Sequence, residues 1–181
     1  MNRRHFIISS GLFLGTGFAG GEYWRNRWKY IVVHHSAGSR GDIPLLRRVH
    51  RERQAGDPVD AIPYHYVIGN GNGLGLGEIA TDWRAEYHLW GAHVSGRNFD
   101  RNLRGLGICL IGNFEVESVP EEQYRSLVRL TRQLMASYGI SPENVCGHGQ
   151  VPGENTKCPG KNFPYSAFRE DIRKDSGSAI R

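Results

Sequence analysis

The chain has 181 residues, of which 39% are hydrophobic and 23% are charged, and its formal net charge is +5 with neutral histidines. This length supplies one full hydrophobic core and is short for two domains. The basic residues are scattered and form no recognised nucleic-acid-binding motif, so composition and charge argue against a nucleic-acid partner.

The first 21 residues have the layout of an export signal. Arg3 and Arg4 precede an apolar stretch from Phe6 to Phe18, and small residues follow at 19–21. The apolar stretch is short for a membrane span. The adjacent arginines favour twin-arginine export, although an ordinary secretory signal or an uncleaved anchor shares this layout. We therefore expect a periplasmic or secreted protein, which an uncleaved segment would retain at the membrane.

Residues 30–175 are expected to form a single α/β domain, after a polar lead-in at 22–29 and before a frayed tail at 176–181. Runs of β-branched and aromatic residues predict strands, and apolar residues at helical spacing predict helices. The predicted strands are 30–35, 62–69 and 105–114, and the predicted helices are 42–54, 119–139 and a short one from about 166. Because strands alternate with helices, we expect helices packed on a sheet.

Two of these strands carry further signals. The sequence "NGNG" at 70–73 predicts the tip of a hairpin after the strand at 62–69. The strand at 105–114 is apolar on both faces, which is typical of a central strand.

The first strand ends in two histidines, His34 and His35, and a later loop rich in glycine and proline contains His148 and Cys158. Successive strand residues point to opposite faces, so one of the paired histidines is expected to do chemistry. Either of them, with His148 and Cys158, would give three protein ligands and an open position, the pattern of catalytic zinc. Imidazole and thiolate favour zinc over magnesium or calcium. The residues alone leave open a purely hydrogen-bonding role for the loop histidine.

Three cysteines, Cys109, Cys146 and Cys158, cannot all pair within one chain. In an oxidising compartment the leftover thiol needs an explanation, and a metal ligand would be one. Cys109 is most simply a buried thiol of the central strand. Pairing of Cys109 with Cys146 stays open, because no spacing demands it.

Four separated segments, "VVHHSAG", "IPYHYVIG", "GAHVSG…GLGICLIGNF" and "GHGQVPGENTKCPG", resemble type 2 N-acetylmuramoyl-L-alanine amidases in the same order. That family includes phage amidases and the peptidoglycan recognition proteins. The resemblance runs from about Tyr30 to Phe168. It implies a central mixed sheet flanked by helices, and zinc-dependent hydrolysis of the amide between N-acetylmuramic acid and L-alanine in peptidoglycan or its fragments.

The resemblance also implies roles for individual residues. His34, His148 and Cys158 would hold one zinc ion per chain, and His35 would then face away from it. Relatives often carry an acidic residue where Gln150 stands, which leaves the support of the ligands in doubt.

Further positions follow from the same resemblance. Tyr64 and Thr156 would be catalytic, Tyr64 by orienting or deprotonating the attacking water and Thr156 by holding the oxyanion. His93 would line the substrate groove. Lys157 lies one place from the lysine position of phage enzymes, so it is not assigned that role.

Two rival functions are compatible with the same residues. Many peptidoglycan recognition proteins lack the cysteine ligand and bind without cutting, so Cys158 favours hydrolysis over a non-catalytic binding module. A cysteine peptidase would use Cys158 and His148 as nucleophile and base. A glycosidase would need two carboxylates flanking a cleft, and no such pair stands out.

Overall fold

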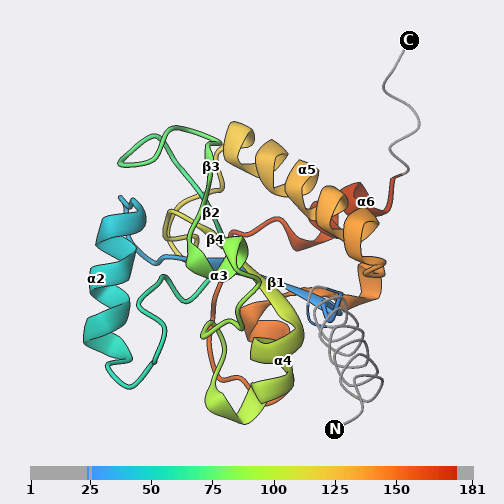
Figure 1. The fold of residues 1–181 in the computed structure, drawn as a ribbon. Coiled ribbons are helices and arrows are strands. Elements are labelled where there is room, and N and C mark those ends of the chain that lie inside the picture. The colour runs from blue at the N-terminus through green and yellow to red at the C-terminus, as the bar shows by residue number, and fades with distance from the viewer. Residues whose placement is uncertain (1–23, 25, 175–181) are drawn as a thin grey trace, which may run out of the picture.

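The computed structural model describes residue 24 and residues 26–174 (Figure 1). A five-stranded sheet has the order β3-β2-β4-β1-β5. Its strands are β1 (Tyr30–His35), β2 (Tyr66–Ile68), β3 (Ile79–Thr81), β4 (Gly105–Leu110) and β5 (Val145–Gly147). The β2–β3 pair is antiparallel, whereas β4 and β5 both run parallel to β1, and β2 runs parallel to β4. The expected mixed sheet is confirmed, and its middle strand β4 is buried along its whole length.

Helices cover both faces of this sheet. The α-helices are α2 (Ile43–Arg53), α3 (Trp83–Glu86), α4 (Phe99–Arg104), α5 (Glu121–Tyr138) and α6 (Tyr165–Arg173). Figure 1 shows α5 and α6 side by side, with α2 on the other side of the sheet. Short 3₁₀ turns are η1 (Gly96–Asn98), η2 (Pro142–Asn144) and η3 (His148–Gln150). None of the helices in the described part of the chain is long and apolar enough to cross a membrane.

Local sequence explains where the two amphipathic helices begin and end. The Asp42 side chain caps α2 by accepting a hydrogen bond from the Leu45 amide at 2.8 Å. Two glutamates occupy the first turn of α5, where they favour the positive end of the helix dipole. Gly139 ends α5 with φ +63°, a left-handed conformation that glycine adopts without a steric penalty.

The alternation of side chains along β1 divides it between two environments. Ile31 and Val33 enter the large core cluster beneath α5 and α6. Val32 packs in a separate cluster with Val94 and Val151. His34 shares the face of Val32, so the strand delivers its imidazole to the side of the sheet opposite α5.

The strands predicted at 62–69 and 105–114 are shorter in the structure, where they form β2 and β4. The segment from Ile62 to His65 does not form a strand. The His65 amide still donates to the Gly107 carbonyl oxygen at 2.9 Å, but other hydrogen bonds of this segment involve side chains. The Ile62 amide donates to the Asp82 carboxylate at 2.9 Å, and the Gly107 amide donates to Nδ1 of His65 at 3.0 Å. Strand β4 ends at Leu110, two residues before Gly112 with φ +147°. The predicted export signal at 1–21 and the tail at 176–181 lie outside the described residues.

Candidate metal centre

Parallel pairing of β1 with β5 brings two histidines to one edge of the sheet. The register places Val33 opposite Gly147. His34 follows the first of these residues and His148 follows the second, so both imidazoles emerge at the same end of neighbouring strands. Their ring centroids are 4.7 Å apart. His34 is 1% exposed, whereas His148 is partly exposed.

The loop after η3 adds a sulfur atom to the two imidazoles. Potential ligand atoms of His34, His148 and Cys158 lie within 4.8 Å of one another. The Sγ atom of Cys158 is 3.8 Å from Nδ1 of His34. Ligands at ordinary zinc–sulfur and zinc–nitrogen distances in a tetrahedron are separated by roughly 3.5 Å, close to this spacing. Two imidazoles, one thiol and an open fourth position therefore fit zinc.

Burial keeps both histidines in the neutral form that binds metal. It lowers the pKa of His34 well below its usual value, and the neighbouring histidines act in the same direction. Burial also lowers the pKa of His148, against the opposing effect of the Glu154 carboxylate. The pKa of the Cys158 thiol is raised to about 12 by burial. A thiol in this environment is a poor free nucleophile, which argues against a cysteine peptidase.

Tyr64 and Thr156 both lie beside the three ligands. The Tyr64 ring centroid is 5.1 Å from that of His34. Burial raises the pKa of Tyr64 well above its usual value, and the neighbouring Cys109 thiol, which is hydrogen bonded to the tyrosine, acts in the same direction. The Thr156 hydroxyl oxygen accepts a hydrogen bond from the Cys158 amide at 3.2 Å, so its own proton stays free to be donated.

His35 lies as expected, pointing away from the ligands. Its ring packs beside Phe114, and Nδ1 accepts a hydrogen bond from the Phe114 amide at 3.2 Å. Its backbone amide donates to Sγ of Cys158 at 3.4 Å. The side chain therefore braces the loop after β4, while the backbone supports the thiol.

The structure does not place His93 on the wall of a groove. The side chain is 5% exposed, and its Nδ1 lies 3.1 Å from Nε2 of His34. Its other ring nitrogen, Nε2, lies 3.3 Å from the Gly105 carbonyl oxygen. His93 therefore lies inside the protein, behind His34.

The residue that sequence reasoning missed is Glu154. Its Oε2 atom lies 3.2 Å from Nε2 of His148. Gln150 stands where relatives often carry an acidic residue, and its side-chain oxygen accepts a hydrogen bond from the Gly147 amide at 3.1 Å. The acidic residue occurs four positions later in the same loop, and its presence between His148 and Cys158 was the available signal.

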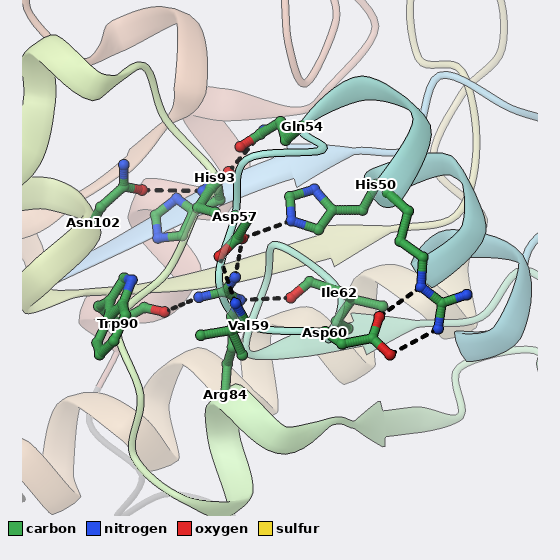
Figure 2. A network of polar contacts seen from close by, with 12 residues as sticks. His50, Gln54, Asp57, Val59, Asp60, Ile62, Arg84, Trp90, His93 and Asn102 are labelled. Atoms are coloured by element: carbon green, nitrogen blue, oxygen red, sulfur yellow. Dashed lines mark hydrogen bonds and ion pairs between the residues drawn. The ribbon is translucent and has the colours of Figure 1, made fainter.

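Figure 2 shows a buried polar network next to this centre. Arg84, which is fully buried, donates to the carbonyl oxygens of Ile62 and Trp90 and pairs with Asp57. Asp57 also accepts from His50 at 2.7 Å. The Ile62 carbonyl lies in the segment just before Tyr64 in the chain, and the Trp90 carbonyl lies in the segment just before His93. One guanidinium therefore holds both segments in place.

His65 and the three cysteines complete the description of the residues that the sequence singled out. His65 is buried, and its Nε2 lies 3.0 Å from the Leu89 carbonyl oxygen. Cys109, Cys146 and Cys158 are all free, so the disulfide left open between the first two does not form.

Comparisons with known proteins identify the family of this chain. The sequence model of the N-acetylmuramoyl-L-alanine amidase family matches residues 24–161. The 1,6-anhydro-N-acetylmuramyl-L-alanine amidase AmpD of Salmonella typhimurium is 31% identical over 97 residues, which cover 51% of this chain and 50% of AmpD. The corresponding protein of Enterobacter cloacae is 28% identical over 107 residues, covering 58% and 56%. The matched region thus spans about half the length of these curated relatives.

Solved structures extend the likeness over more of the chain. The endolysin N-acetylmuramoyl-L-alanine amidase LysCS of Clostridium intestinale superposes with a TM-score of 0.63 at 28% identity, covering 82% of this chain and 86% of LysCS. A Drosophila peptidoglycan recognition protein, PGRP-LB, shares the fold with a TM-score of 0.55 at 23% identity, covering 77% and 79%. The family match over 24–161 and these shared folds show that the chain belongs to the N-acetylmuramoyl-L-alanine amidase family.

Proposed function

We propose that this protein is a zinc-dependent amidase. Its substrate would be the amide that joins the lactyl group of N-acetylmuramic acid to L-alanine, in peptidoglycan or its fragments. The observation that carries the proposal is the convergence of His34, His148 and Cys158 at the end of β1 and β5, in a chain of this family. Support for fragments as substrates comes from the names of relatives, which include a 1,6-anhydro-muramyl amidase and a recognition protein in complex with tracheal cytotoxin.

Bound zinc would supply Lewis-acid activation of the scissile carbonyl and of the attacking water. The Tyr64 ring centroid lies 5.1 Å from that of His34, so its hydroxyl would orient or deprotonate the attacking water. The Thr156 hydroxyl would donate a hydrogen bond to the oxyanion that develops on the carbonyl oxygen. Loss of one such donor costs about 3 kcal/mol in other enzymes.

Zinc content and hydrolysis, measured together, test this function. The purified protein should contain one equivalent of zinc and release peptide stems from muropeptides. Chelation should stop the reaction and added zinc should restore it, because the ion would activate the carbonyl and the attacking water. Hydrolysis that ignores the chelator would overturn the zinc assignment and favour a thiol nucleophile. Stoichiometric zinc without cleavage of either intact wall or fragments would favour the binding module.

Replacement of Tyr64 with phenylalanine should lower kcat by about 100-fold while the zinc content stays at one equivalent. The change removes only a hydroxyl from a ring that packs beside His34, so the ligands keep their positions. Tyr66→Phe is the matched control, because Tyr66 packs in the core cluster on the other face of the sheet. Equal kcat values for the two variants would remove Tyr64 from the mechanism.

We further propose that the protein acts outside the cytoplasm. The support is the sequence of the first 21 residues, with its adjacent arginines, apolar stretch and small residues. Amino-terminal sequencing of the protein recovered from a periplasmic extract would test this proposal. If the protein is instead recovered from the membrane fraction with residues 1–21 intact, it is retained there by an uncleaved segment.

A further inference from the structure

Hydrogen bonding behind His34 determines which of its nitrogens carries the proton. The Gly105 carbonyl oxygen can only accept, so Nε2 of His93, 3.3 Å away, must donate to it. His93 is buried, and its ring contacts the Gly105 carbonyl and the imidazoles of His34 and His65, surroundings that favour the neutral ring. Its Nδ1 is then an acceptor and takes a proton from Nε2 of His34 at 3.1 Å. The lone pair of His34 is left on Nδ1, the atom that lies 3.8 Å from Sγ of Cys158.

A carboxylate imposes the same protonation on His148. Nε2 of this histidine lies 3.2 Å from Oε2 of Glu154, and an ionised carboxylate can only accept. The other carboxylate oxygen of Glu154, Oε1, accepts from three donors, so hydrogen-bond donors surround this side chain as they would an acceptor-only carboxylate. The lone pair of His148 is therefore also on Nδ1.

One loop supports both of these acceptors. It contains His93 itself, and it orients Glu154 through three donors to Oε1, namely the Ser95 amide at 3.0 Å, the Ser95 hydroxyl at 2.6 Å and the Asn98 amide group at 2.6 Å. Because these donors occupy Oε1, Oε2 is left for His148. The Asn102 side chain fixes the start of the loop by accepting from the His93 amide at 3.0 Å.

From this arrangement we propose that His93 and Glu154 are positioning residues, each of which holds one metal ligand as its Nε2–H tautomer with Nδ1 facing the ion. The inference rests on the proposed zinc site and assigns two residues to its assembly. Each residue acts through the ligand that it contacts. Their contribution is to the affinity for zinc, and partners of this kind typically change metal affinity by 10- to 100-fold.

Imidazole ¹⁵N NMR of the metal-free wild-type protein tests the tautomers directly. His34 and His148 should both show a protonated Nε2 and an unprotonated Nδ1. A protonated Nδ1 on either histidine would overturn the proposal for that residue's partner. This measurement requires neither zinc nor substrate, so it is independent of hydrolysis.

Glu154→Gln should reverse the tautomer of His148. The glutamine oxygen will face the three donors from Ser95 and Asn98, which turns its NH₂ group toward Nε2 of His148. That nitrogen must then accept, so the proton moves to Nδ1 and blocks the ligand atom. We expect zinc affinity, measured by competition with a chromophoric chelator, to fall 10- to 100-fold. Glu143→Gln, at an exposed carboxylate paired with Arg173, is the control and should leave the affinity unchanged.

His93→Phe keeps a ring but removes the acceptor for Nε2 of His34, and it should lower zinc affinity by a similar factor. His93→Gln restores an acceptor oxygen and a donor, so it should recover most of that loss. Zinc affinities of Glu154→Gln and His93→Phe within twofold of the wild type would overturn the proposal. A wild-type protein with the expected tautomers and zinc affinities that cleaves no substrate would instead support this inference and overturn the proposed function.

Discussion

Replacing Cys158 with alanine should abolish zinc binding and the hydrolysis of muropeptides together. The thiol supplies one of three donors at the centre, and its Sγ lies 3.8 Å from Nδ1 of His34. Two imidazoles alone leave the ion with too few protein ligands for a catalytic zinc site. Loss of the metal removes several kcal/mol of transition-state stabilisation, so we expect the rate to fall at least ~1,000-fold. Metal analysis and a muropeptide assay on the same preparation check both effects.

Cys146→Ala is the matched control for this experiment. Cys146 is a free thiol whose side chain packs against Val32, Val94 and Val151, away from the donor set. We expect the control to retain one equivalent of zinc and its activity. Circular dichroism of both variants would separate loss of the metal from loss of the fold. A Cys158→Ala protein that is folded, free of zinc and still active would end the metal hypothesis.

Asp57→Asn should lower the free energy of unfolding by about 3–5 kcal/mol. The carboxylate is 7% exposed and pairs with Arg84, which is 0% exposed (Figure 2). The substitution leaves the guanidinium buried without a counter-charge, and such an unpaired charge is costly in the protein interior. Urea unfolding of the metal-free protein measures the change without the contribution of a bound ion.

A solvent-exposed ion pair in the same region of the chain provides the control for this buried pair. Asp60 pairs with Arg51, and the side chains are 55% and 59% exposed. Because water screens this pair, Asp60→Asn should cost less than about 1 kcal/mol. Equal destabilisation by the two substitutions would show that burial of the Arg84–Asp57 pair is not what makes it important.

Residue types and strand patterns were sufficient to predict much of the fold and the ligands. The strand that ends in His34 and His35 follows from its run of β-branched and aromatic residues, and helix α5 follows from helical periodicity and its end signals. Histidines at a strand end, with a histidine and a cysteine in a later loop, made the ligand candidates visible, and the family resemblance selected His34 over His35. By contrast, the strand predicted at 62–69 was too long. A carboxylate from Asp82 and the ring of His65 take over hydrogen bonds that the pattern assigned to backbone.

The support of the ligands could not be predicted because it depends on loop conformation. Nothing in the sequence places His93 behind His34, since they are 59 residues apart and only the packing of the loop against β4 joins them. Glu154 was missed for a related reason. The resemblance directed attention to Gln150, and the position of a carboxylate around His148 depends on how the loop turns, which spacing alone does not reveal.

His34 and Cys158, separated by 124 residues, meet only when the sheet and the last loop are both in place. An ion bound to both residues cross-links the chain and closes a loop that contains most of its residues. Closing a loop of this length by a covalent link restricts the unfolded chain by about 5 kcal/mol at room temperature. Because the ion restricts the unfolded chain, the protein is more stable after it binds metal than before. The step at which the metal binds therefore decides when the protein gains this stability. A chain that crosses a membrane unfolded must acquire its metal at its destination, whereas one that crosses folded can carry the metal with it.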